Sequence, residues 1–345
     1  MEQRARAVVA VVGAVAFFLV VQFGALALAE PFREAGYQSV EDPQNPANSA
    51  LYVGVILVAT VVMLALMRYG RTTILRGFLV LTSGLIAGYV FSVAVPAVVI
   101  DAFGGINLSA WVGGAAVSLG LLLYPEWWVI DASALLMGMG AAALFGISFG
   151  ILPALLLLIA LAVYDAISVY GTKHMLTLAS GVMELRVPVL VIIPTTIDYS
   201  FIEDAESMAA SVGSDGDDGS ESDDTEETPG ESGRPDDGTG ADEATDEFDR
   251  EAIFIGLGDA VMPSILVASA SVFVETPTVL GVEMAPLGAI VGTTAGLLVL
   301  LWMVLKGRAH AGLPLLNGGA IAGYLVGALA AGIPLLAALG IEGWI

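Results

Sequence analysis

Two aspartates interrupt strongly apolar stretches of the chain. Asp165 follows LLLLIALAVY, and Asp259 lies between IFIGLG and AVMPSILVASA. A carboxyl group near the middle of a bilayer costs roughly 2.5–3.5 kcal/mol on insertion scales, so each of these residues needs a reason to be there. By contrast, Glu126, Asp131 and Glu184 lie in loops or near the ends of apolar stretches, and we interpret them as residues at the membrane surface.

A pair of carboxyl groups can hydrolyse a peptide bond without a cofactor, so we expect none. Two such groups placed close together share one proton. The ionised carboxylate takes a proton from water as the water attacks the peptide carbonyl, and the protonated carboxyl donates to the carbonyl oxygen. The chain has no cysteine and only two histidines, which excludes a cysteine nucleophile and argues against a histidine-based metal site.

Other roles for buried acids remain open at this point. Two such residues can hydrogen-bond helices together in a structural protein without any reaction, or they can relay protons in a proton-coupled transporter or channel. The sequence shows no convincing internal repeat of the kind that transporters carry. A proton pathway would also need more than two acids.

The elements that must position these acids are membrane-spanning helices. The chain has 345 residues, of which 57% are hydrophobic, and this fraction is typical of an integral membrane protein rather than a soluble domain. We expect an all-α protein in the cell membrane with nine spans of about 20 residues. Their ranges are 7–29, 50–67, 74–100, 107–123, 128–147, 150–170, 252–273, 287–305 and 317–340.

The basic residues orient these spans. With the N-terminus in the cytoplasm, 11 of the 12 Lys and Arg residues fall on cytoplasmic segments and only Arg33 lies outside. The C-terminus is then outside. Arg4, Arg6 and the run 27–29 imitate a secretory signal peptide, but an apolar stretch of about 23 residues is too long for one, so we expect a retained helix.

This orientation places the two aspartates at a similar depth. Asp165 precedes Lys173 by eight residues, and Asp259 follows Glu251 by eight. At a rise of 1.5 Å per residue, each acid lies about 12 Å from the cytoplasmic boundary. Because the sixth and seventh spans run in opposite directions, we expect their carboxyl groups to meet.

The residues around the second acid favour a flexible backbone. Gly256, Leu257 and Gly258 directly precede Asp259, and each glycine in a helix costs about 1 kcal/mol relative to alanine. Glycine there lets the backbone loosen and lets a substrate strand approach closely. A third element, GLPLLNG at 312–318, opens the ninth span at a similar depth, and its proline disturbs the start of the helix.

Two of these elements resemble motifs of the presenilin and signal peptide peptidase family of intramembrane aspartyl proteases. Tyr164 and Asp165 in the sixth span match its Tyr-Asp motif. Gly256, Gly258 and Asp259 in the seventh match its Gly-x-Gly-Asp motif.

The third element resembles the Pro-Ala-Leu motif of the same family. Pro314 and Leu316 match it, whereas Leu315 replaces the alanine; Leu313 and these three residues are expected to shape the site. The bulk of Leu315 puts in doubt how closely this loop packs against the acids. The resemblance covers nearly the whole chain and is closest to archaeal members.

The resemblance implies an aspartic endopeptidase that cuts transmembrane segments, with Asp165 and Asp259 as its catalytic pair. A cytoplasmic N-terminus matches the presenilin arrangement, which implies substrates whose own N-terminus lies outside. Apart from membrane lipids, no further partner is implied, neither obligate subunits nor nucleic acid.

The spans divide the chain into two membrane parts, 1–173 and 251–345, joined by a cytoplasmic loop at 174–250. Of the 35 Asp and Glu residues, 20 lie between Glu203 and Glu251, in a segment rich in Ser and Gly. We interpret 203–250 as a disordered acidic linker, of a kind that hints at a haloarchaeal source.

The β-rich segment 186–197 is too short to span. It is either a loop lying on the surface or a strand that pairs with an unwound substrate. Farther along the chain, Gly319, Gly323 and Gly327 form a small-residue face for helix packing in the ninth span.

Overall fold

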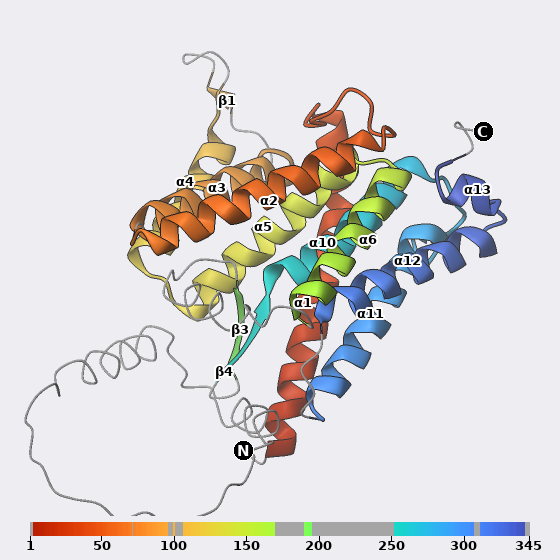
Figure 1. The fold of residues 1–345 in the computed structure, drawn as a ribbon. Helices are drawn as coiled ribbons and strands as arrows, with labels where there is room; N and C mark the ends of the chain where they lie inside the picture. The colour runs from red at the N-terminus through yellow and green to blue at the C-terminus, as the bar shows by residue number, and fades with distance from the viewer. Residues whose placement is uncertain are drawn as a thin grey trace, which may run out of the picture.

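The computed structural model describes residues 3–70, 72–95, 99–100, 106–169, 190–194, 252–306 and 311–341. The expected acidic linker at 203–250 lies outside these residues, as does most of the loop at 174–250. The described chain is a bundle of helices with three short β-ribbons (Figure 1).

Each of the nine predicted ranges overlaps one helix of 16 residues or more, which confirms a mainly helical membrane protein. Six of these helices are long and apolar enough to cross a bilayer, and α4, α6 and α10 are apolar but shorter. The helices are α1 (Gln3–Glu34), α2 (Ala47–Arg68), α3 (Thr72–Ala94), α4 (Leu108–Leu123), α5 (Trp127–Ser148), α6 (Ile151–Ile167), α10 (Leu257–Phe273), α11 (Met284–Val304) and α12 (Gly312–Ala330), followed by the one-turn helix α13 (Leu335–Ala338).

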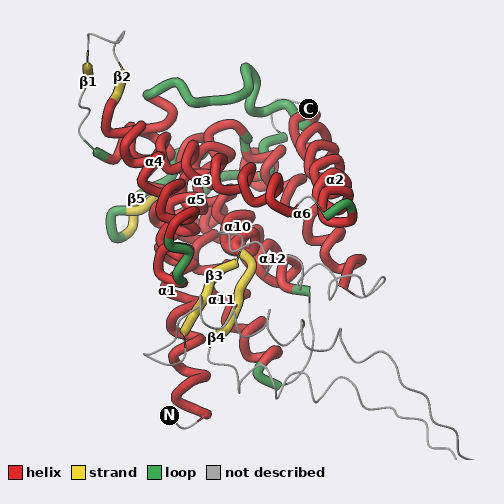
Figure 2. Tube along the Cα trace, turned by 90° about the vertical axis from the view of Figure 1, so that its left-hand side faces the viewer, coloured by secondary structure: helices red, strands yellow, loops and turns green. Residues whose placement is uncertain are grey.

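The strands pair as three antiparallel ribbons. β1 (Val99–Ile100) pairs with β2 (Ile106–Asn107), and β5 (Thr278–Val279) pairs with β6 (Val282–Glu283). The longest ribbon joins β3 (Leu190–Pro194) to β4 (Ala252–Gly256). Figures 1 and 2 show the β3–β4 ribbon at one end of the bundle, near the start of α1, and β1 and β2 at the other end.

Three predicted spans have different ends in the structure. The third was expected to reach residue 100, but α3 ends at Ala94. The seventh was expected to be helical from 252, but residues 252–256 form β4. The ninth was expected over 317–340, but α12 runs from Gly312 to Ala330 and the chain turns at Gly332, whose φ is 85°.

Helix α10 lies at the centre of the bundle and contacts α1, α5, α6, α11 and α12. Nearly every side chain from Ala260 to Ala270 is buried. A helix that is apolar on all sides lies either in lipid or among other helices, and the burial of α10 places it among helices. Its fully buried serines are satisfied: the hydroxyl of Ser264 donates to the carbonyl of Ala260, and that of Ser269 donates to the carbonyl of Phe149 on α5–α6.

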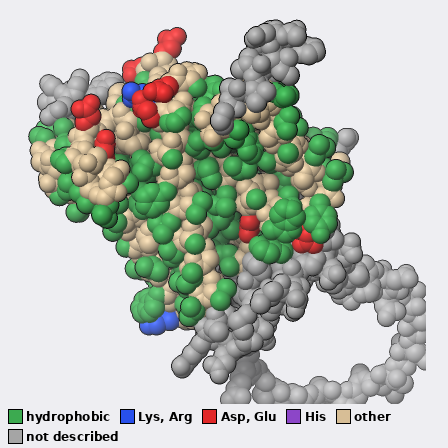
Figure 3. All heavy atoms as spheres, turned by 180° about the vertical axis from the view of Figure 1, so that it is seen from behind, with side chains coloured by type: hydrophobic (Ala, Val, Ile, Leu, Met, Phe, Trp, Pro, Cys, Tyr) green, Lys and Arg blue, Asp and Glu red, His purple; other side chains and the backbone are tan. Residues whose placement is uncertain are grey.

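The outer surface is strongly apolar. Helix α2 exposes Leu51, Val58 and Val61 by more than 60% each, and its most apolar stretch contains no buried residue. Hydrophobic side chains cover most of the face in Figure 3, with charged side chains mainly toward its two ends. An exposed apolar surface of this extent fits contact with lipid.

Helices α11 and α12 pack with their backbones in close approach. A Cβ atom on Gly288 would clash with the carbonyl oxygen of Gly323, and one on Gly292 would clash with that of Gly319. Gly327 lies against the backbone of Met284. The predicted packing face of the ninth span is therefore confirmed, and its partner is the glycine row of α11.

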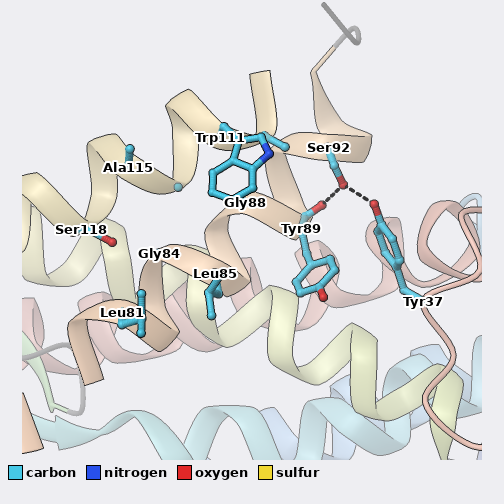
Figure 4. Close-up of a pocket in the computed structure, with 12 residues that line it drawn as sticks. Tyr37, Leu81, Gly84, Leu85, Gly88, Tyr89, Ser92, Trp111, Ala115 and Ser118 are labelled. Carbon is cyan, nitrogen blue, oxygen red and sulfur yellow. Dashed lines mark hydrogen bonds between the residues drawn. The ribbon is translucent and has the colours of Figure 1, made fainter. Parts of the chain in front are cut away.

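A groove of about 360 Å³ lies between α3 and α4. Figure 4 shows Leu81, Leu85 and Tyr89 along one wall and Trp111 on the other, with Ser92 bonded to Tyr37 at one end. None of its lining residues is among the predicted site residues, so the groove is separate from the aspartates.

The close approach of α11 and α12 predicts that Gly292→Ala lowers the melting temperature. The added methyl group would force the two helices apart, and overpacking of this kind costs about 1–3 kcal/mol. Gly54→Ala on α2 is the matched control, because a Cβ at Gly54 meets no atom within 4 Å. Thermal unfolding in detergent measures the melting temperatures of both variants. A Gly292→Ala protein that melts with the wild type would contradict the packing.

Candidate active site

Asp165 lies at the end of α6, two residues before Ile167, and only 8% of it is exposed. Its Oδ2 atom accepts a hydrogen bond of 3.0 Å from the backbone N–H of Leu313. Leu313 is the second residue of α12, and the first N–H groups of a helix have no partner within it. The start of α12 therefore supplies a donor, and a favourable helix dipole, to this acid.

Asp259 is the third residue of α10, directly after β4. A Cβ atom built on Gly256 would lie 3.5 Å from its Oδ2, and one built on Gly312 would lie 3.6 Å from the same atom. Asp165 is close enough to act on Asp259 electrostatically. The first two residues of α12 thus contact both acids, so the three predicted segments meet.

Two glycines, Gly256 and Gly258, lie at the junction before Asp259. Gly256 ends the strand with φ −64° and ψ 126°, and the helix begins at Leu257. These angles suit any residue, and a Cβ atom on Gly258 would meet nothing within 4 Å. The fold itself therefore requires neither glycine, and the small size of both leaves space around the carboxyl group.

Pro263 adds a further irregularity to α10. It lies inside the helix and has no N–H to donate to the carbonyl of Asp259, four residues earlier. The first turn of α10 is therefore less tightly bonded than an ordinary helix. The four-residue spacing between Asp259 and Pro263 is a signal that the sequence already carries.

Asp131 is a second residue whose role sequence reasoning missed. It was interpreted as a residue at the membrane surface, but its Oδ1 atom accepts a 2.8 Å hydrogen bond from the N–H of Ile192 on β3. This bond attaches the β3–β4 ribbon to α5. The sequence signal for this role was the position of Asp131, one turn inside a predicted span and four residues after Trp127.

The other predicted site residues occupy different surroundings. Tyr164 is 48% exposed, whereas Leu257 and Leu316 are buried. Pro314 and Leu315 are partly buried in the first turn of α12, where a missing proline N–H has no cost. Leu315 is the residue that differs from the Pro-Ala-Leu motif. Its carbonyl packs against Gly296 on α11, where the absence of a side chain leaves room for it.

Comparisons with known proteins show the family of the chain. The family described as "Signal-peptide peptidase, presenilin aspartyl protease" matches residues 15–333. The chain belongs to this family. It is an intramembrane aspartic endopeptidase and a multi-pass membrane protein. A comparison with curated proteins found no match.

Two solved structures resemble the protease over nearly its whole length. One, of a presenilin family intramembrane aspartate protease in space group C222, is 33% identical, covers 93% of this chain and 99% of that chain, and has a TM-score of 0.59. Another of the same description, in space group P2, is 34% identical, covers 92% and 97%, and has a TM-score of 0.57.

The open space around Gly258 predicts that Gly258→Ala lowers catalytic activity and leaves stability unchanged. The methyl group would occupy space beside Asp259, so we expect kcat/KM for a transmembrane peptide to fall about tenfold at an unchanged melting temperature. Gly77→Ala on α3 is the control, since its Cβ also meets no atom within 4 Å. Equal activity of the two variants would contradict a role for this space.

The hydrogen bond from the Ile192 N–H to Asp131 predicts that Asp131→Leu and Asp131→Asn have different KM values for a transmembrane peptide. Leucine leaves a buried N–H without a partner, at a cost of about 1–3 kcal/mol, and frees the ribbon from α5. Asparagine keeps an acceptor oxygen. We expect KM for a transmembrane peptide to rise in the leucine variant and to stay near wild type in the asparagine variant. Similar KM values for the two would argue against the attachment.

Proposed function

We propose that Asp165 and Asp259 are the catalytic pair of this protease. The supporting observation is that one short segment, the start of α12, lies beside both acids: the Leu313 N–H donates to Asp165, and a Cβ atom on Gly312 would lie 3.6 Å from Oδ2 of Asp259. Carboxyl groups from two helices are thereby brought together in an otherwise apolar bundle. No other acid is placed this way in the described part of the chain.

The contacts assign different roles to the two acids. An ionised carboxylate accepts hydrogen bonds and cannot donate them, and Asp165 already accepts one from Leu313. We therefore assign Asp165 as the general base and the protonated Asp259 as the general acid. Asp165 removes a proton from water as its oxygen attacks the peptide carbonyl, and Asp259 donates its proton to the carbonyl oxygen.

The same pair completes the reaction with its roles reversed. The tetrahedral intermediate carries two hydroxyl groups on the former carbonyl carbon. Asp165, now protonated, gives its proton to the leaving nitrogen, while Asp259, now ionised, takes one from a hydroxyl group. The C–N bond breaks, and the two aspartates return to their starting protonation states with a carboxylic acid and an amine as products.

The β3–β4 ribbon offers a place for the substrate backbone. Because the N–H of Ile192 points to Asp131, its neighbours Val191 and Ile193 face β4 in the antiparallel register. The backbone groups of Phe254 and Gly256 then point to the other edge of β4, where no strand lies in the described chain. A substrate segment that unwinds and pairs with this edge would lie beside Asp259.

The substrates are transmembrane segments of other proteins, with their N-terminus outside the cell. This follows from a topology of nine spans with a cytoplasmic N-terminus and an outer C-terminus. In support, the start of α1 and the helix α13 lie at opposite ends of the bundle (Figure 1). The membrane parts 1–173 and 251–345 flank a cytoplasmic loop at 174–250 with its acidic linker at 203–250.

The catalytic pair is tested by reconstituting the protease with a labelled transmembrane peptide. Asp165→Asn and Asp259→Asn each remove one proton-transfer group at nearly constant size, so we expect each to lower kcat by at least about 10²–10⁴. Glu275→Gln, at an exposed acid, is the control and should cut normally. Normal cutting by either asparagine variant would overturn the assignment. Proton transport without cleavage would favour a transporter.

A further inference from the structure

The contact between Leu313 and Asp165 depends on how α12 is placed along α6. The two residues come from different helices, so a shift of α12 along its axis would remove the N–H from the carboxyl group. A displacement of 1 Å in an active site can cost about 10²-fold in rate. Something must therefore fix the axial position of α12.

The packing of α12 on α11 does not fix it. The glycines of α11 at 288, 292 and 296 and those of α12 at 319, 323 and 327 recur every four residues. A shift of α12 by four residues, about 6 Å, would place glycine against glycine again. Backbone contact between such rows holds the helices together but allows more than one register.

Asn317 provides a contact that allows only one register of α12 on its neighbours. It lies one turn after Leu313, is 0% exposed, and donates a 3.0 Å hydrogen bond from Nδ2 to the carbonyl oxygen of Leu158 on α6. Leu158 lies seven residues before Asp165, so two hydrogen bonds at different levels join α6 and α12. Hydrogen bonds are directional, whereas the apolar contacts around them are not.

The amide of Asn317 is only half satisfied. Its Oδ1 atom is buried and has no hydrogen-bond partner among the described residues. A buried polar atom without a partner is destabilising, and a leucine of similar size would avoid that cost. Stability alone thus does not explain an asparagine here, whereas placement of the helix does, since a single buried asparagine can specify the register of packed helices.

We propose that Asn317 is a positioning residue of the protease: its bond to Leu158 sets the register of α12 and thereby holds the Leu313 N–H on Asp165. The proposal rests on the catalytic role of Asp165. Asn317 lies a turn away from the segment that contacts the acids, so it acts through α12 and takes no part in proton transfer.

The first test is Asn317→Leu in the reconstituted protease. We expect kcat to fall about tenfold or more while KM changes less than twofold, because the register affects the reacting groups more than the substrate edge of β4. Tyr324→Phe is the matched control. It also removes one buried side-chain hydrogen bond of α12, from the Tyr324 hydroxyl to the carbonyl of Ala338, but far from the acids. We expect its kcat to match the wild type.

A distance measurement tests the register without using activity. The chain has no native cysteine, so spin labels on cysteines introduced at Val163 of α6 and Val326 of α12, both exposed, report the placement of these helices alone. We expect a shifted or broadened distance distribution for Asn317→Leu and an unchanged one for Tyr324→Phe.

Asn317→Asp covers the case in which the leucine variant does not fold. An aspartic acid keeps a donor for the Leu158 carbonyl only while it is protonated. Its kcat relative to wild type should therefore rise as the pH falls. A flat ratio, or a leucine variant with wild-type kcat and distances, would overturn the role of Asn317. Normal cutting by Asp165→Asn or Asp259→Asn would instead count against the proposed catalytic pair.

Discussion

The hydrogen bond from the Leu313 N–H to Oδ2 of Asp165 is the interaction on which the site depends. A helix start has N–H groups without partners, and a carboxylate in an apolar bundle needs donors, so each satisfies the other. The bond brings α12 onto α6, and Gly312 then falls beside Asp259. Three distant segments thus meet where this backbone donor reaches its acceptor.

The central position of α10 closes its sides and leaves Asp259 at its first turn. Five helices surround α10, so its sides are closed to lipid, and Asp259 lies in its first turn, where the chain changes from strand to helix. That end is continuous with β4, which Asp131 and β3 hold in place. The burial that stabilises α10 therefore directs access to the end that carries the carboxyl group.

The sequence alone predicted the helices, the two acids and their meeting, because hydrophobic periods and buried charges are strong local signals. It did not predict β4: a short apolar run with β-branched residues suits a strand or a buried helix equally well, and only pairing with β3 decides. The ninth span was expected over 317–340 with 312–318 at its opening, whereas the helix already includes 312–316, since proline fits a first turn. Asp131 and Asn317 act through contacts with distant backbone, which no local pattern reveals.

The sequence separation of the contact between Asp165 and Leu313 also bears on biosynthesis. The two residues are 148 positions apart in the chain. A ribosome that adds about 5–20 residues per second needs on the order of ten seconds to cover that length. During this interval α6 is already made while the helix start that contacts its acid is not. In a nascent chain the contact between Asp165 and Leu313 therefore cannot form until α12, the last long helix of the described chain, is synthesised.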